Sequence, residues 1–313
     1  MTRRTFLVGG MWALAAAVGA AAGLEVVTRE ARRLPSPDPT AAAPATGGPT
    51  AGVSSGNGAP PSPHPSEAPG QAAPWPTPTP GRVPPDGFTL TVPVLMYHRV
   101  VPPELAGDSL PGLVVPPTLF AAQLGALLAA GWRSITVAQV AQALQSGQPL
   151  APRTLALSID DGWNDGYIYA LPALQQVGYR ATYYVIGRRI GARSFLSGAQ
   201  LRALMAAGME VGDHTFDHIG LPALSGARQR YEIDAAASRI ADVLGYSPVT
   251  FSYPAGEFDP AVEEAVQAAG FGLAVTTEEG AVQTWPGRFS APRVRVSPSM
   301  SPTTLVRTLE RWA

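Results

Sequence analysis

The chain has 313 residues, 46% of them hydrophobic and 14% charged, which is enough for at least one globular domain with its own core. Its formal net charge of −1 leaves no surplus of basic residues for a nucleic-acid partner. The absence of cysteine excludes disulfides, thiolate metal sites, a cysteine nucleophile and a lipid-modified N-terminal cysteine. A metal site would therefore use carboxylates and the four histidines, which are His64, His98, His214 and His218.

Residues 1–30 predict an export signal or a membrane anchor. Arg3 and Arg4 precede an uncharged stretch, residues 6–23, that is rich in Ala, Val and Gly. The arginine pair also resembles a twin-arginine export motif, and Ala20–Ala22 offers a cleavage site. The stretch is at the lower limit of length for an uncleaved anchor. We therefore expect an exported protein, extracellular or at the cell surface, that is either released or held in the membrane by residues 6–23.

Residues 31–87 are expected to form a disordered linker. Within them, the window 35–86 holds 16 of the chain's 33 prolines, interleaved with Ala, Ser, Thr and Gly. Such a segment cannot bury enough apolar surface to offset the conformational entropy that it would lose on folding. His64 lies inside it, so we expect a solvated side chain there and no part in a site.

Residues 88–313 alternate short β-branched runs with helical segments, which predicts a parallel sheet with crossover helices. Seven strands in one domain favour an α/β fold, a closed or nearly closed (β/α) barrel of about seven parallel strands with its chemistry on loops at the strand carboxyl ends. A doubly wound open sheet is the alternative. The predicted strands are Val92–Tyr97, Thr154–Ile159, Ala181–Ile186, Met209–Gly212, Val249–Tyr253, Phe271–Val275 and Arg293–Val296, and the predicted helices are Thr118–Ala130, Val137–Gln145, Ala199–Ala207, Arg228–Leu244 and Pro260–Ala269.

Two adjacent carboxylates, Asp160 and Asp161, follow the most hydrophobic of these strands and precede Gly162. At such a bend the two side chains point in different directions, so one can bind a cation while the other stays free as a base. The alternative is a polar turn that caps the next helix.

His214 and His218 follow another strand at a spacing of four residues. That spacing places both imidazoles on one side of a helical turn, close enough to chelate one ion. Together with Asp161 they would form a set of two histidines and one carboxylate that leaves coordination positions open for water and substrate. Asp160, beside this set, would be the base. A chance pair of surface histidines is the alternative.

The order of three motifs resembles the polysaccharide deacetylase domain, also called the NodB homology domain or carbohydrate esterase family 4. The motifs are Asp160-Asp161-Gly162, His214-Thr215-x-x-His218 and Phe251-Ser252-Tyr253-Pro254-Ala255-Gly256. The resemblance implies a distorted (β/α) barrel that removes acetyl groups from N-acetylated sugars. It implies that Asp160 is the general base and that Asp161, His214 and His218 bind zinc or a similar divalent ion.

Two departures from the family pattern concern the residues around the base. The arginine that orients the catalytic aspartate in the family is replaced by Ser252, and Arg293 is the candidate substitute, with a surface ion pair as its alternative. The family's next aromatic residue, which contributes a backbone N–H to the oxyanion hole, is Ala255, and a backbone donor tolerates alanine. We also expect Tyr253 and Pro254 of this motif to contact substrate.

The family's late histidine, which supplies the general acid, is absent, since no histidine follows His218. The remaining candidate is His98, which follows the first predicted strand and could reach the same end of the barrel. A buried histidine bonded to backbone is the alternative. The sequence around His98, together with Tyr253-Pro254-Ala255-Gly256, resembles the branch of the family that contains the poly-N-acetylglucosamine deacetylases. Trp163, Tyr167 and Trp285 are candidates for stacking on sugar rings.

These features predict a metal-dependent hydrolase that acts on carbon–nitrogen bonds other than peptide bonds and releases acetate from N-acetylglucosamine-containing polysaccharide of a cell wall or matrix. Zn²⁺ is the expected ion, with Co²⁺, Ni²⁺ or Mn²⁺ as alternatives. Peptidoglycan, poly-N-acetylglucosamine, chitin oligomers and xylan all fit as polymers, and no protein partner is indicated. The alternative functions are an O-acetyl carbohydrate esterase and a non-catalytic glycan-binding module.

Overall fold

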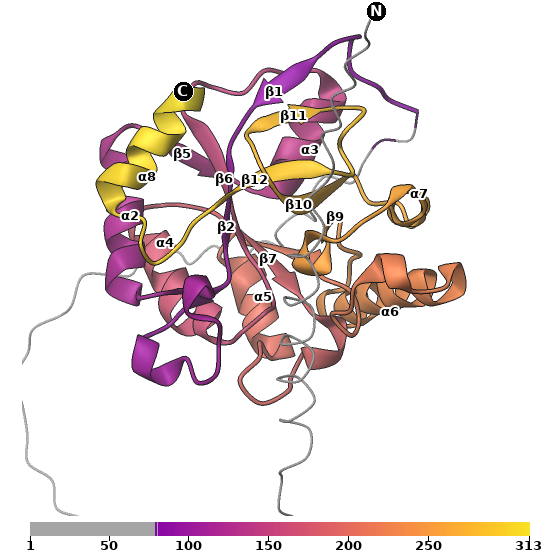
Figure 1. Ribbon diagram of the computed structural model, residues 1–313, viewed down its shortest axis with the longest axis horizontal. Helices are drawn as coiled ribbons and strands as arrows, with labels where there is room; N and C mark the ends of the chain where they lie inside the picture. The colour runs from indigo at the N-terminus through magenta and orange to yellow at the C-terminus, as the bar shows by residue number, and fades with distance from the viewer. Residues whose placement is uncertain (1–78, 80) are drawn as a thin grey trace, which may run out of the picture. The chain divides into compact units, whose positions relative to one another are not determined.

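The computed structural model describes residues 79 and 81–313, and in this part of the chain seven parallel strands close into a barrel. The strands follow one another around the barrel in chain order, and the pairing of β2 with β6 closes the ring. With the helices around them (Figure 1), they confirm the predicted (β/α) barrel and exclude the doubly wound open sheet. The barrel strands are β2 (Val94–Tyr97), β6 (Thr154–Ile159), β7 (Thr182–Val185), β8 (Glu210–Asp213), β9 (Thr250–Ser252), β10 (Leu273–Glu279) and β12 (Ala291–Arg295).

The barrel is irregular at two places, as the distorted barrel implied by the family resemblance would be. The additional strand β5 (Arg133–Ile135) pairs with the first half of β6, on the edge that β7 occupies beside the second half. The pairing of β10 with β12 shifts register between Val275 and Glu279. Two short strands, β3 (Arg99–Val100) and β4 (Val114–Val115), form a separate parallel pair.

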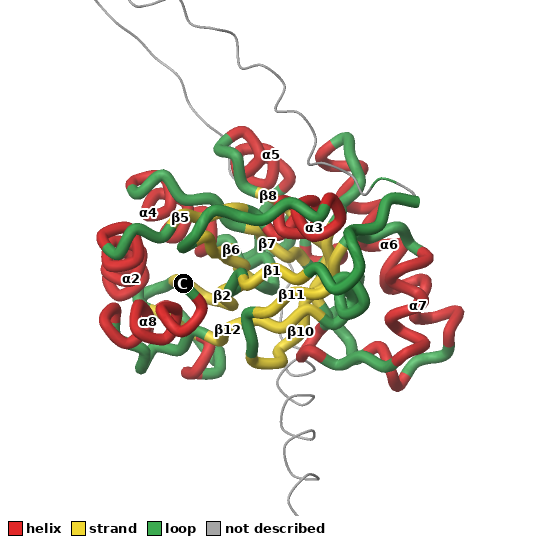
Figure 2. Tube along the Cα trace, turned by 90° about the horizontal axis from the view of Figure 1, so that it is seen from above, coloured by secondary structure: helices red, strands yellow, loops and turns green. Residues whose placement is uncertain are grey.

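Helices surround the strands when the barrel is seen from above (Figure 2). Polar caps define where several begin: Thr136 forms a capping box with Gln139, and Ser197 forms another with Gln200. The five predicted helices are present within two residues of the expected bounds, while α4 and α8 lie outside the predicted set. The helices are α2 (Pro117–Ala129), α3 (Val137–Ser146), α4 (Leu171–Gln176), α5 (Gly198–Ala206), α6 (Gly226–Leu244), α7 (Pro260–Ala268) and α8 (Pro302–Leu309).

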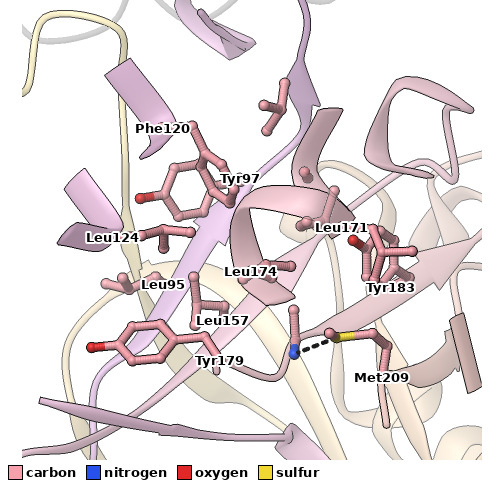
Figure 3. Packing of buried hydrophobic residues seen from close by; sticks show 14 of the residues in the cluster. Leu95, Tyr97, Phe120, Leu124, Leu157, Leu171, Leu174, Tyr179, Tyr183 and Met209 are labelled. Carbon is pink, nitrogen blue, oxygen red and sulfur yellow. Dashed lines mark hydrogen bonds between the residues drawn. The ribbon is translucent and has the colours of Figure 1, made fainter. Parts of the chain in front are cut away.

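The largest apolar cluster lies between the barrel strands and the helices packed outside them (Figure 3). Every residue of β6 is buried, as expected for a parallel strand covered on both faces. Tyr97 packs edge-on against Phe120 of α2, with ring centres 5.1 Å apart, and its hydroxyl donates to Gln123 Oε1 at 3.1 Å. This packing fixes the end of β2 relative to its covering helix.

One end of the barrel is closed. The antiparallel ribbon of β1 (Thr89–Thr91) and β11 (Val282–Thr284) lies over the end where the barrel strands begin (Figure 1, Figure 2). Its Leu90 belongs to an apolar cluster with Val94, Tyr184 and Leu273. The polar residues that follow β2, β6, β8 and β9 therefore belong to the opposite end, where the strands finish.

The expected export segment, most of the expected linker and His64 lie outside the described residues. The first strand, β1, begins at Thr89, one residue after the expected start of the domain at Phe88. Within residues 79 and 81–313, no helix combines the length and the apolar character needed to cross a bilayer.

Candidate active site

Asp160 and Asp161 follow β6 directly and face different partners. Asp161 and Gly162 both have a left-handed backbone, with φ of 74° and 72°, so the chain turns sharply here. At Gly162 a Cβ would lie 3.1–3.2 Å from atoms of Val185 on β7, which explains the glycine. The turn separates the carboxylates: Asp160 is 2% exposed and contacts Arg293, whereas Asp161 contacts the two histidines.

The segment from His214 to His218 is an irregular loop after β8, so the predicted helical turn is wrong. Thr215 and His218 have left-handed backbones, with φ of 62° and 59°, which an α-helix does not contain. The loop is tied to α6 instead, because the Phe216 N–H donates to the Glu232 carbonyl at 2.9 Å. The loop nevertheless brings the two imidazole rings to 4.8 Å between their centres.

Asp161, His214 and His218 offer ligand atoms that fit one metal ion. Asp161 Oδ1 lies 3.5 Å from His214 Nε2 and 3.4 Å from His218 Nε2, and all three ligand atoms lie within 4.8 Å of one another. Tetrahedral zinc with bonds of about 2.0–2.1 Å requires ligand atoms about 3.3 Å apart. His214 Nδ1 donates to the Ser252 carbonyl at 2.7 Å, so Nε2 is the nitrogen that can bind a cation once it has lost its proton.

The charges of the three residues also suit a cation. Partial burial and the positive charge of His214 lower the pKa of His218 to about 4, so His218 is neutral at pH 7, as a ligand must be. Burial alone would lower the pKa of His214, but the adjacent Asp161 and Asp160 raise it above its usual value. Burial alone would raise the pKa of Asp161, but His214 and His218 hold it well below its usual range.

Arg293 of β12 provides the counter-charge of Asp160. Its Nη1 donates to Asp160 Oδ1 and its Nη2 contacts Asp160 Oδ2, both at 2.9 Å. The guanidinium is fixed by the Thr276 carbonyl at 2.7 Å and by Ser158 Oγ at 2.9 Å. Burial would raise the pKa of Asp160, but Arg293 and the neighbouring histidines hold it below its usual value. Asp160 is therefore an ionised and oriented carboxylate.

The alternative of a surface ion pair for Arg293 is wrong, since its side chain is 1% exposed. Its Nη2 also donates to the Ser252 hydroxyl at 3.3 Å. The arginine that the family carries at position 252 is thus replaced by one that reaches the same carboxylate from β12, 133 residues along the chain from Asp160.

His98 follows β2 directly and lies at the same end of the barrel. The preceding residue, Tyr97, pairs with Ile159, so the next residues along the two strands are His98 and Asp160. Burial lowers the pKa of His98, while the charges of Asp160 and Asp161 oppose this shift without cancelling it. The structure thus brings His98 within electrostatic reach of both carboxylates.

Ala255 is exposed after β9 and has a left-handed backbone, with φ of 55°. Such a conformation costs a residue with a side chain roughly 1–2 kcal/mol. Its carbonyl accepts a hydrogen bond from the Thr277 hydroxyl at 3.3 Å. Left-handed residues other than glycine cluster at functional positions, so this backbone conformation suits a role for Ala255 in the site.

The prediction that Tyr253 and Pro254 contact substrate is wrong for their side chains. Tyr253 is 1% exposed, and its hydroxyl donates to the Phe289 carbonyl at 2.8 Å. Its ring packs against Phe251 and Phe258. Pro254 is buried as well. Tyr253 belongs to an apolar cluster around β9, so these two side chains form part of the core next to the site.

The aromatic side chains considered for sugar stacking have other partners. Trp163 stacks on Phe195 with ring centres 4.3 Å apart, and the Arg99 guanidinium lies 4.1 Å from the centre of the indole, so both faces are covered. Tyr167 packs against the main core cluster. Trp285 lines a cavity of about 380 Å³ at the closed end of the barrel. The expected stacking of Trp163 on a sugar ring is therefore wrong.

Sequence patterns missed the residues that hold the histidine loop. Asp217 pairs with Arg188 at 2.5 Å and with Arg228 at 2.7 Å. Buried Glu232 accepts from the Asp217 N–H at 2.7 Å. The signal that could have found this network is an acidic residue, Glu232, beside Ile233 on the apolar face of α6.

The profile of the polysaccharide deacetylase family matches residues 147–274. YxkH of Bacillus subtilis (strain 168), which is assigned to the polysaccharide deacetylases, is 31% identical over 211 residues that cover 67% of this chain and 73% of YxkH. This chain belongs to the polysaccharide deacetylase family. Asp160, Asp161 and both loop histidines lie inside the matched segment, whereas His98 and Arg293 lie outside it.

Solved deacetylase structures share the barrel. The deacetylase PplD of Streptococcus pyogenes, solved in complex with acetate, aligns with a TM-score of 0.64 and 28% identity over 69% of this chain and 97% of PplD. IcaB of Ammonifex degensii aligns with a TM-score of 0.61 and 25% identity over 69% of this chain and 96% of IcaB. Family membership makes the chain a hydrolase that acts on acetylated polysaccharide.

Proposed function

We propose that this deacetylase removes N-acetyl groups from extracellular polysaccharide that contains N-acetylglucosamine, with a divalent ion held by Asp161, His214 and His218. The observation that carries the proposal is the pairing of a three-residue ligand set with a second, buried carboxylate. Asp160 is adjacent to the set in sequence but is bound by Arg293, so it remains available for proton transfer. Zn²⁺ fits the donor set best, and Co²⁺, Ni²⁺ or Mn²⁺ would also fit.

The proposed roles follow from these contacts. The ion would supply Lewis-acid polarisation of the acetyl carbonyl and a lowered pKa of water. Asp160 accepts the proton of the attacking water, and Arg293 holds its carboxylate in place. The backbone N–H of Ala255 is assigned to the oxyanion that forms as the carbonyl becomes tetrahedral.

His98 is assigned to the leaving nitrogen. His98 follows β2 beside Asp160 at the end of β6, and among the described residues it is the one imidazole outside the ligand set, so it is the candidate to protonate the amine as the C–N bond breaks. Acetate and a free amino sugar result. The resemblance of the sequence around His98 to the poly-N-acetylglucosamine deacetylase branch supports the choice of an N-acetylglucosamine polymer. An extracellular polymer agrees with the export signal or membrane anchor that is expected in residues 1–30.

Acetate release from defined substrates tests the proposed bond. The full chain, loaded with Zn²⁺, is incubated with N-acetylglucosamine oligomers and, separately, with O-acetylated xylan. We expect acetate from the N-acetylated oligomers and none after treatment with a chelator. Release from xylan alone would identify an O-acetyl esterase, and release from neither substrate by the metal-loaded chain would favour a glycan-binding module.

A further inference from the structure

Trp163 has a packing partner on each face of its ring. Its backbone pairs with Phe195, whose ring also stacks on the indole at 4.3 Å between centres. The next backbone contact, from the Leu196 N–H to the Gly162 carbonyl at 2.9 Å, ties the same two segments together. The indole can therefore move little relative to the turn that carries Asp161.

The second face of the indole is covered by a buried cation. The Arg99 guanidinium, 4.1 Å from the indole centre, is ion-paired with Asp165. It also donates to Ser109 Oγ at 2.6 Å and to the Ala106 carbonyl at 3.3 Å. Arg99 and Asp165 are 8% and 2% exposed. The buried ion pair holds the Arg99 guanidinium in place, and the guanidinium in turn packs against the indole.

The one polar atom of this indole points to a proposed metal ligand. Trp163 Nε1 donates to Asp161 Oδ2 at 3.2 Å. The other carboxylate oxygen, Oδ1, is the one that lies 3.5 and 3.4 Å from the two histidine Nε2 atoms. Asp161 Oδ2 thus accepts the hydrogen bond from Trp163, while Asp161 Oδ1 faces the two histidines.

We infer that Trp163 is a positioning residue that holds Asp161 so that Oδ1 alone faces the ion. The inference rests on the proposed metal site. An indole N–H is a donor without acceptor capacity, so it occupies Oδ2 without competing for the ion. Partners of this kind typically change metal affinity about 10–100-fold when removed. Arg99 and Asp165 act one step further out, by holding the indole.

Trp163→Phe is the matching perturbation, because a phenyl ring keeps the stack between Phe195 and Arg99 but has no N–H. Trp285 offers the control, since an arginine, Arg288, lies 4.2 Å from its ring centre at the closed end of the barrel. Trp285→Phe therefore removes an indole in the same kind of contact, away from the site.

The experiment measures the dissociation constant of Zn²⁺ for the full chain by competition with a chromophoric chelator, together with the visible spectrum of the Co²⁺-loaded protein. We expect Trp163→Phe to weaken Zn²⁺ binding by about tenfold or more and to change the Co²⁺ spectrum, because Oδ2 becomes free to coordinate. Trp285→Phe should leave both readouts unchanged, and the thermal midpoint in chelator should show that both variants fold.

The outcomes separate this inference from the proposed function. Wild-type affinity and an unchanged Co²⁺ spectrum in Trp163→Phe would overturn the positioning role while leaving the metal site intact. A wild-type chain that binds neither Zn²⁺ nor Co²⁺ would refute the metal site itself and the inference with it.

Discussion

Arg293→Met removes the positive charge that faces Asp160 while keeping an unbranched side chain of similar length. Both partners are buried, with exposed fractions of 1% and 2%, and two contacts of 2.9 Å join them. Loss of one member of such a pair costs about 3–5 kcal/mol, because an uncompensated charge stays buried. For a domain of this size that corresponds to a drop of roughly 6–20 °C in the thermal midpoint.

The same substitution should change how activity depends on pH. In the wild type the pKa of Asp160 is held below its usual value, so the ionised base persists on acidification and its contribution to stability is lost only as pH falls through that low pKa. Without Arg293, burial dominates and raises the pKa. The acid limb of acetate release should therefore move to higher pH in Arg293→Met.

Denaturation monitored by circular dichroism and a pH profile of acetate release check both effects. The double variant Asp160→Asn/Arg293→Met should recover much of the lost stability, because no charge remains to be buried. Arg288→Met, at the closed end of the barrel, is the control for loss of an arginine. A loss below about 1 kcal/mol in Arg293→Met, with an unmoved acid limb, would refute the role of Arg293 as the counter-ion.

Two further predictions concern the metal and the core. Affinity for Zn²⁺ should fall as pH is lowered, because the raised pKa of His214 means that a cation must displace its proton. Competition with a chelator between pH 8 and pH 5.5 measures this affinity. An affinity that does not change with pH would contradict the ligand role of His214. Tyr253→Phe should cost about 1 kcal/mol, the value of a hydrogen bond to the Phe289 carbonyl, without changing KM. A large rise in KM at unchanged stability would restore Tyr253 as a substrate contact.

The barrel could be predicted from the sequence because its strands are short, buried and β-branched, and because the chain alternates them regularly with helices. All seven predicted strands are present, although their first and last residues differ from the predicted ones by a few positions. The additional strands β1, β3, β4, β5 and β11 have two or three residues each and carry no periodic signal of their own. The six-residue helix α4 follows a π-helical turn, Gly166–Ala170, and is too short for its pattern to stand out.

The site was predictable to the extent that its residues follow strands in recognisable motifs. Asp160, Asp161, His214 and His218 meet because parallel strands end at the same edge of a barrel. The conformation of the histidine loop was not predictable, since it depends on hydrogen bonds to α6 and not on spacing. A motif also does not tell which of its side chains face inward.

Contacts between distant segments were the hardest to predict. Nothing in the local sequence indicates that Arg99 and Phe195 enclose Trp163, because these residues are brought together only by packing. The residues next to Trp163 in the sequence would be the same whether its indole were exposed for stacking on a sugar or enclosed by other side chains. The pairing of Arg293 with Asp160 was proposed only because a family resemblance left that carboxylate without its expected arginine.

Asp160→Asn tests the central claim, that Asp160 is a base beside a metal site to which it does not contribute. The variant and the wild type are loaded with Zn²⁺, their metal content is measured, and acetate release from N-acetylglucosamine oligomers is followed. The account predicts an equal metal content and a loss of activity of at least about 100-fold in the variant. Acetate release at the wild-type rate, or loss of the metal together with the activity, would contradict it.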